Sequence, residues 1–186
     1  VNGKKLWTTT AQEADKVMLL ARTTPREAVK KPTDGLTLFY TDLDRKYCDV
    51  REIPKMGRAA VDSNEVFFDG LPVPLEDRVG EEGEGFKYIL HSLNPERILI
   101  GAEAVGLGQN ALARAVEYAK TRVVFDRPIG QNQSIQHPLA ENWMELEAAY
   151  LMASKAAWLY DHGEACGAES NAAKYMGGEA GFKACT

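Results

Sequence analysis

Cysteine and histidine are both scarce in this sequence. Its 186 residues include three cysteines, Cys48, Cys166 and Cys185, which lie far apart and show no paired metal-ligand spacing. Such usage is typical of reduced thiols in the bacterial cytoplasm or the mitochondrial matrix, and it argues against disulfides and structural zinc. His91 and His137 lack partners at metal-ligand spacing, so we predict structural or solvent-facing roles for both, and no metal site.

Long apolar runs and an excess of positive charge are also absent. No apolar run approaches the roughly 18 residues that a membrane-spanning helix requires, and the formal net charge is -5. We therefore predict no membrane span and no nucleic-acid partner, because nucleic acids bind basic surfaces. P-loops, glycine-rich dinucleotide fingerprints and a Ser-His-Asp order are missing too, which argues against the functions that those motifs mark.

The first half of the sequence contains strand chemistry. Short runs of β-branched and aromatic residues are separated by Pro, Gly and Asp, a pattern typical of antiparallel strands joined by turns. The expected strands lie at Lys16–Ala21, Leu36–Thr41 and Glu65–Asp69, and Thr23–Asp34 is expected to be an exposed loop. The acidic, glycine-rich run from Glu81 to Gly85 marks the domain boundary, so we place a β domain at residues 1–81.

Residues 82–186 change to an alanine-rich pattern with a period near 3.6, which predicts long helices. Asn94 and Pro95 form a helix start signal, so the first helix is expected from Pro95 to about Thr121. Its apolar stripe includes small residues that let a neighbouring helix come close. The stripe consists of Ile98, Gly101, Val105, Gly108, Leu112, Ala115 and Ala119.

A second helix is expected from about Ile135 to Asp161, with His162-Gly163 at its end, and a third from about Ala168. The inward stripe of the second helix is expected to be Leu139, Trp143, Leu146, Tyr150, Ala153, Ala157 and Tyr160. The predicted fold class is α+β, with a small antiparallel β-barrel or sandwich followed by an incomplete up-down helical bundle. The sequence starts without Met and stops inside a predicted helix, so we expect both ends to be internal to a longer protein.

Trp7 and Thr9 form the first candidate for chemistry. In a strand, their spacing of two puts both side chains on one face. An aromatic plane beside a hydroxyl suits a flavin, whose ring is flat and whose N5 and O4 edge requires a hydrogen-bond donor. Spacing alone favours the plainer interpretation, which is an ordinary tryptophan in a β core.

Glu96 and Arg97 are the second candidate. A carboxylate in the first turn of a helix interacts favourably with the helix dipole, and composition alone favours that role for Glu96. Arg97 is either a solvated cation or a hydrogen-bond donor to a carboxyl group or a substrate carbonyl. The local sequence leaves these alternatives open.

The polar loop from Thr121 to Gln133, between the first two predicted helices, is the third candidate. Arg122, Arg127 and the amide side chains of this loop suit a ligand with phosphates and an adenine ring, although such a loop also serves as a plain connector. Lys30 and Lys31 on the earlier loop either meet a phosphate or are simply solvated.

Taken in order, these segments resemble the acyl-CoA dehydrogenase family, and the resemblance covers essentially the whole chain. The elements that carry it are Asn2-Gly3-Lys4-Lys5-Leu6-Trp7-Thr8-Thr9, Gly57 to Pro74 with Val66-Phe67-Phe68-Asp69 and Val73-Pro74, Gly83-Glu84-Gly85-Phe86, Arg97, and Arg122 to Gln133. The resemblance implies a flavoprotein fragment that contains the middle β domain and the first part of the C-terminal helical domain.

The resemblance also implies how FAD is bound. Trp7, Thr8 and Thr9 match the segment packed along the flavin ring, with Thr9 as the partner of the N5 and O4 edge. A second group, Arg122, Phe125 and Gln133, matches the loop that reaches the FAD of a neighbouring subunit, which implies a homodimer or homotetramer.

That loop departs from the family pattern at two positions. Val124 stands where a threonine often contributes a hydroxyl, and Asp126 stands where glycine is usual. An acidic side chain near a pyrophosphate is unfavourable unless it points away or pairs with Arg127.

For the substrate, the most informative match is the segment from Asn94 to Ile100. Most of the family carries its catalytic carboxylate later in the chain, but some members place it at the start of this helix, where Glu96 stands. Arg97 matches an arginine next to the active site, and Asn94 a polar position that helps bind the acyl-CoA. Lys31 is a further candidate for substrate binding.

The implied activity is FAD-dependent α,β-dehydrogenation of acyl-CoA thioesters, of the type found in fatty-acid β-oxidation. Glu96 would remove the α-proton while the β-hydrogen leaves as hydride to flavin N5, so base and flavin must face opposite sides of the acyl chain. An electron-transfer flavoprotein is the implied electron acceptor. The alternatives are an acyl-CoA oxidase or another flavoprotein on the same fold, and a non-catalytic, flavin-free relative that acts as an interaction module.

Overall fold

The computed structural model describes all 186 residues, which form two compact units, Val1–Leu90 and His91–Thr186. The content is mixed helix and strand, as the sequence predicts. The division between the units falls inside helix α1 (Gly85–Thr121), which begins in the first unit and continues in the second. The domain boundary at residues 81 and 82 stays a prediction from composition.

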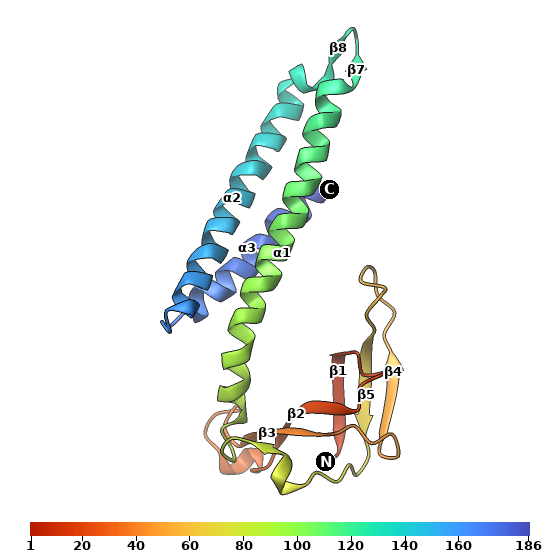
Figure 1. Ribbon diagram of the computed structural model, residues 1–186, viewed down its shortest axis with the longest axis vertical. Helices are drawn as coiled ribbons and strands as arrows, with labels where there is room; N and C mark the ends of the chain where they lie inside the picture. The colour runs from red at the N-terminus through yellow and green to blue at the C-terminus, as the bar shows by residue number, and fades with distance from the viewer. The chain divides into compact units, whose positions relative to one another are not determined.

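The strands of the first unit form two three-stranded antiparallel sheets, ordered β1-β5-β4 and β2-β3-β6, and no closed barrel is present (Figure 1). Their bounds are β1 Gly3–Thr9, β2 Lys16–Arg22, β3 Leu36–Asp42, β4 Cys48–Glu52, β5 Ser63–Phe68 and β6 Arg78–Val79. The three expected strands are confirmed as β2, β3 and β5. The sequence pattern misses β4 because this five-residue strand contains only two apolar residues, Cys48 and Val50.

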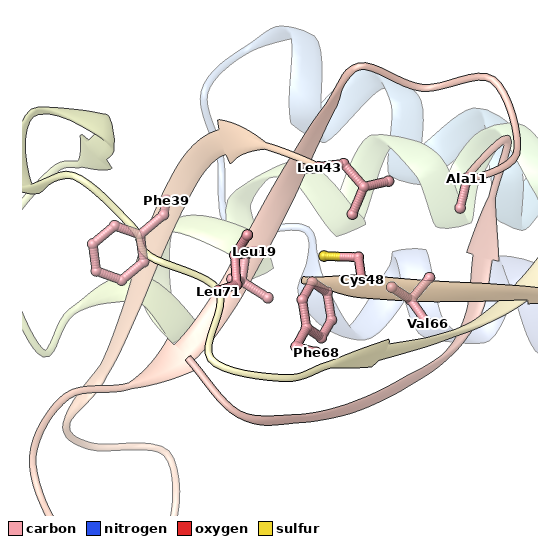
Figure 2. Close-up of a cluster of buried hydrophobic side chains, with 8 residues drawn as sticks. All are labelled: Ala11, Leu19, Phe39, Leu43, Cys48, Val66, Phe68 and Leu71. Atoms are coloured by element: carbon pink, nitrogen blue, oxygen red, sulfur yellow. The ribbon is translucent and has the colours of Figure 1, made fainter. Parts of the chain in front are cut away.

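One hydrophobic core serves both sheets of the first unit. Figure 2 shows its buried side chains, which come from β2, β3, β4, β5 and the connecting segments. They are Ala11, Leu19, Phe39, Leu43, Cys48, Val66, Phe68 and Leu71. Burial raises the pKa of the Cys48 thiol, which makes it a poor nucleophile.

The expected loop at Thr23–Asp34 is confirmed, with one short 3-10 turn, η1 (Arg26–Ala28).

Helix α1 begins at Gly85, so the expected start at Pro95 is wrong. The start of the helix packs closely against β3. The Gly83 N–H donates to Thr37 Oγ1 at 2.9 Å. Gly85 approaches β3 so closely that a Cβ there would lie 2.5 Å from the Leu38 backbone nitrogen. These contacts lie far apart in the sequence, which is why a local start signal does not reveal them.

Pro95 is therefore an interior helix residue. A proline there removes one backbone hydrogen bond and crowds the preceding turn, yet the helix continues through it to Thr121. As a result, Asn94 is not a helix cap and Glu96 does not lie in a first turn. The interaction of Glu96 with a helix N-terminus is thereby excluded as an explanation of that residue.

The second unit contains the rest of α1, a short hairpin and two further helices (Figure 1). The hairpin is β7 (Val123–Val124) with β8 (Arg127–Pro128), followed by the 3-10 turn η3 (Ile129–Gln131), α2 (Gln133–Asp161) and α3 (Gly167–Cys185). The predicted end of α2 is confirmed: Gly163 has φ +71°, and the N–H groups of Gly163 and Glu164 donate to the Tyr160 and Leu159 carbonyls at 3.0 and 2.9 Å. These two bonds are a Schellman motif.

Small residues line the contacts among the three helices. The predicted α1 stripe is buried except for Ala115, which is exposed. On α2, the prediction is wrong for Trp143, Tyr150 and Tyr160, which are 57%, 51% and 38% exposed. That helix instead buries Leu146, Ala149, Ala153 and Ala156. The α3 helix buries Ser170, Ala173, Gly177, Ala180 and Gly181.

No helix of the chain combines the length and apolarity that a membrane crossing requires.

Candidate functional site

The segment around Trp7 is a β-bulge at the end of β1. Lys5 pairs with Val66 and Thr8 pairs with Asn64, so β1 advances three residues while β5 advances two. The shift falls at Leu6 and Trp7, between these two pairs. The backbone of Trp7 is in the left-handed region, at φ +62°, and so is that of Thr10, at φ +55°. For side chains of this size such angles cost about 1–3 kcal/mol each. Strain held in place at an exposed point is a recognised mark of function.

Trp7 is not a core residue. Its side chain is 64% exposed and absent from the buried cluster of the first unit, so the interpretation as an ordinary core tryptophan is wrong. Thr9 is exposed and Thr8 is half-buried, and neither hydroxyl donates a hydrogen bond within the chain. The bulge therefore presents an open aromatic ring at Trp7, and the hydroxyl groups of Thr8 and Thr9 remain available as hydrogen-bond donors.

A buried network holds the bulge. Asn64 is fully buried; its Nδ2 donates to the Thr8 carbonyl at 3.0 Å and to the Asp62 carboxylate, and its Oδ1 accepts from Gln12 Nε2 at 2.9 Å. The backbone N–H of Gln12 donates to Asp62 Oδ2 at 3.2 Å, and that of Thr10 donates to the Asp62 carbonyl at 3.2 Å. The sequence pattern gives no indication of this network, because its members are distant in sequence.

The Asp62 carboxylate is the titratable member of this network. The hydrogen bond from Asn64 holds the pKa of Asp62 below its ordinary value, helped by the Gln12 N–H and the charge of Lys55 and opposed by partial desolvation. A carboxylate with a lowered pKa in the folded state stabilises the fold above its unfolded pKa and loses that contribution as the pH falls.

We therefore expect the bulge network to weaken as the pH falls below about 4. The unfolding temperature of the wild type should fall more steeply between about pH 6 and about pH 3 than that of Asp62→Asn, which cannot titrate. Thermal unfolding followed by circular dichroism measures this difference. Parallel curves for the two proteins would show that Asp62 contributes nothing to acid sensitivity.

In the second unit, Asn94 and Arg97 lie close together on α1. Arg97 Nη1 donates to Asn94 Oδ1 at 3.2 Å, and both side chains are half-buried. Glu96 is exposed and makes no hydrogen bond or ion pair within the chain. Because successive helical residues are about 100° apart, Glu96 points to a different side of the helix from Asn94. The structure thus brings together two of these three candidates and leaves the Glu96 carboxylate free.

A cleft of about 610 Å³ lies beside Asn94. Its other lining residues are His91, Tyr160, Gly163, Glu164, Ala165, Cys166 and Gly167, from α1, the end of α2 and the connection to α3. The His91 and Tyr160 rings are 6.5 Å apart between centroids. Sequence reasoning missed this cleft, because local patterns do not reveal that these segments meet. The expectation that His91 has a structural or solvent-facing role agrees with its exposed side chain.

The predicted adenosine-binding loop is a tight hairpin (Figure 1). Its two central residues, Phe125 and Asp126, have φ +52° and +60°, as a type I′ turn requires. Glycine suits such positions, and aspartate tolerates the left-handed region better than most residues. Asp126 forms no ion pair with Arg127, whose Nη2 donates to Asn132 Oδ1 at 2.6 Å.

The three candidate residues of this hairpin region are all exposed. Phe125 lies at the hairpin tip and is 94% exposed. Arg122 directly precedes β7, and Gln133 is the first residue of α2. The Arg122 guanidinium makes no hydrogen bond or ion pair within the chain, while its backbone carbonyl accepts from the Ile129 N–H at 2.9 Å. A positive group, an aromatic ring and an amide of this region are therefore each exposed.

Lys31 lies on the exposed loop between β2 and β3. The Lys31 backbone N–H donates to Asp34 Oδ2 at 3.4 Å, and Arg22 fixes the loop by donating to the Asp34 carbonyl at 2.9 Å. The Lys31 ammonium group has no partner within the chain and is open to solvent. Nothing in its surroundings distinguishes a phosphate contact from a solvated lysine, so its role stays a prediction.

Comparison with known proteins gives matches over both units. Residues 83–186 match the family model for the C-terminal domain of acyl-CoA dehydrogenase. Over 193 residues, the chain is 36% identical to acyl-CoA dehydrogenase fadE12 of Mycobacterium bovis, which covers 99% of this chain and 47% of that protein.

Solved structures share the fold. Butyryl-CoA dehydrogenase from Megasphaera elsdenii superposes with a TM-score of 0.85 and 33% identity, covering 96% of this chain and 46% of the other. A structure described as PigA with FAD and proline gives a TM-score of 0.90 and 29% identity, covering 98% and 47%. The chain spans about half the length of these similar proteins.

Proposed function

Because this chain belongs to the acyl-CoA dehydrogenase family, we propose that its protein is an FAD-dependent oxidoreductase that forms an α,β double bond in acyl-CoA thioesters. The observation that carries the proposal is the match of both units, in order, to relatives named for this activity. This chemistry requires a bound flavin and a base. The exposed, strained bulge of the first unit would contact the flavin, and the free Glu96 carboxylate of the second unit would be the base.

The residues of the bulge fit a flavin. The exposed Trp7 ring would pack along the flat isoalloxazine system, and the Thr8 and Thr9 hydroxyls would donate to its polar edge, with Thr9 toward N5 and O4. Bound FAD supplies the acceptor for the hydride that leaves the β carbon. The role of the bulge is to hold the donor groups still, since preorganised donors stabilise charge better than mobile ones.

Glu96 is the proposed base. Its carboxylate would take the α-proton as the α C–H bond breaks, and the acyl group is oxidised by two electrons as the β-hydrogen leaves with its bonding pair. Entry of an acyl chain removes water from the carboxylate, and desolvation strengthens a carboxylate as a base. Asn94 and Arg97, joined by their hydrogen bond, would bind the acyl-CoA, and Lys31 would contact a phosphate of the substrate.

Arg122, Phe125 and Gln133 would bind the pyrophosphate and adenosine part of an FAD held by a neighbouring subunit, so the active form is a homodimer or homotetramer. We expect Arg122→Ala to weaken FAD binding about tenfold or more, because a hydrogen bond to a charged group contributes about 1.5–3 kcal/mol. The measurement is FAD release on dilution, followed by flavin fluorescence. Arg114→Ala, an exposed arginine earlier on α1, is the control, and equal FAD release from both variants would contradict the role.

Electrons would pass to an electron-transfer flavoprotein, in the cytoplasm of a bacterium or in a mitochondrial matrix. An assay of acyl-CoA oxidation tests this with the protein expressed from its complete gene. A dehydrogenase turns over with an artificial one-electron acceptor and consumes little oxygen, whereas an oxidase consumes oxygen in step with the substrate. Absence of both FAD and acyl-CoA binding would instead favour a non-catalytic interaction module.

A further inference from the structure

The strongest feature outside the proposed contacts is the buried amide of Asn64. Its side chain uses Nδ2 and Oδ1 on three partners: the Thr8 carbonyl, the Asp62 carboxylate and the Gln12 side chain. The residue is 0% exposed, so neither end of its amide is open to water. A buried amide that satisfies both of its ends is a rigid connector.

Two of these partners, Thr8 and Gln12, lie close in sequence to the residues with positive φ. Thr8 directly follows the left-handed Trp7, and Gln12 lies just beyond the left-handed Thr10. The register shifts between Lys5 and Thr8 and resumes at Thr8 and Thr9, and ladder hydrogen bonds are disrupted at such a shift, so strand pairing alone does not fix the path of Leu6 and Trp7. The amide of Asn64 adds one bond at Thr8, directly after this interval, at 3.0 Å, and a second at Gln12, beyond Thr10, at 2.9 Å.

We infer that Asn64 is a positioning residue for the flavin-contacting bulge: it touches neither flavin nor substrate, and it sets the orientation of Trp7 and of the Thr8 and Thr9 hydroxyls. This inference rests on the proposed function. Its consequence is that loss of the amide changes the flavin environment and the rate of reduction, beyond any loss of stability. Displacement of reacting groups by about 1 Å can cost about 100-fold in rate.

The test compares three variants of the protein expressed from its complete gene. Asn64→Leu keeps the volume and removes all three hydrogen bonds. Gln12→Ala, at an exposed position, removes only one and is expected to fold if Asn64→Leu does not. The control is Val50→Ala, which weakens the same sheet in β4, where Val50 pairs with Val66, without contact to the bulge.

The readouts are the visible flavin spectrum, the flavin reduction potential and the maximal rate of reduction by an acyl-CoA under anaerobic conditions. Asn64→Leu, or Gln12→Ala to a smaller extent, should shift the spectrum and lower the maximal rate about tenfold or more, whereas Val50→Ala should change only the unfolding temperature. If the Asn64 and Gln12 variants match Val50→Ala in spectrum and rate, the inference is overturned. A wild type that binds no FAD, or that no acyl-CoA reduces, refutes instead the proposed function.

Discussion

Glu96→Gln is expected to retain FAD and to reduce its flavin with acyl-CoA on the order of 10³-fold more slowly than the wild type. Glutamine keeps the size and hydrogen-bonding capacity of the side chain but cannot accept the α-proton, and general-base catalysis contributes about 10²–10⁴-fold. Glu96 makes no bond within the chain, so the substitution should leave the unfolding temperature unchanged. Stopped-flow absorbance under anaerobic conditions measures the rate.

The control is Glu117→Gln, an exposed carboxylate further along α1 whose single ion pair with Lys120 is weak, at 3.7 Å. It should reduce flavin at the wild-type rate. Near-normal reduction by Glu96→Gln would remove Glu96 from the catalytic role and point to a carboxylate elsewhere in the protein.

Gly177→Val should lower the free energy of unfolding by about 3 kcal/mol, because added carbon atoms in a close-packed contact force the backbone apart. A Cβ at Gly177 would lie 2.5 Å from the Gly101 carbonyl oxygen and 3.1 Å from the Gly101 carbonyl carbon. Both atoms belong to the backbone of α1, so no side-chain rotation relieves the clash. Denaturant unfolding followed by circular dichroism gives the value.

The next residue provides a matched control. Gly178 is exposed on the same helix and a Cβ there would meet nothing within 4 Å, so Gly178→Val should be neutral or slightly stabilising, since valine is a better helix former than glycine. Equal stability of the two variants would contradict the close approach of α1 and α3 at this point.

The parts of the fold that could be predicted are those that local chemistry determines. Short runs with β-branched or aromatic residues, separated by Pro, Gly and Asp, predict β2 and β3. The His162-Gly163 pair predicts the end of α2 with its hydrogen-bonded motif. The start of α1 could not be predicted, because contacts with β3 at Gly83 and Gly85 override the local start signal at Asn94. Tertiary contacts of this kind are invisible to propensity.

For the candidate site, sequence spacing identified Trp7 but not its conformation. A period of two assumes a regular strand, and the bulge beside Trp7 breaks that assumption. Asn64 carries no signal at all, because its importance comes from partners at positions 8 and 12, more than 50 residues away. Asp126 has a left-handed backbone angle, φ +60°, a conformation that glycine adopts without steric cost.

The central claim is tested most directly by an anaerobic titration of the protein expressed from its complete gene with acyl-CoA esters of different chain length and branching, following the absorbance of oxidised flavin. The account predicts that one class of esters bleaches the flavin bands as it is added. A protein without flavin absorbance, or a bound flavin that no ester reduces, would contradict it.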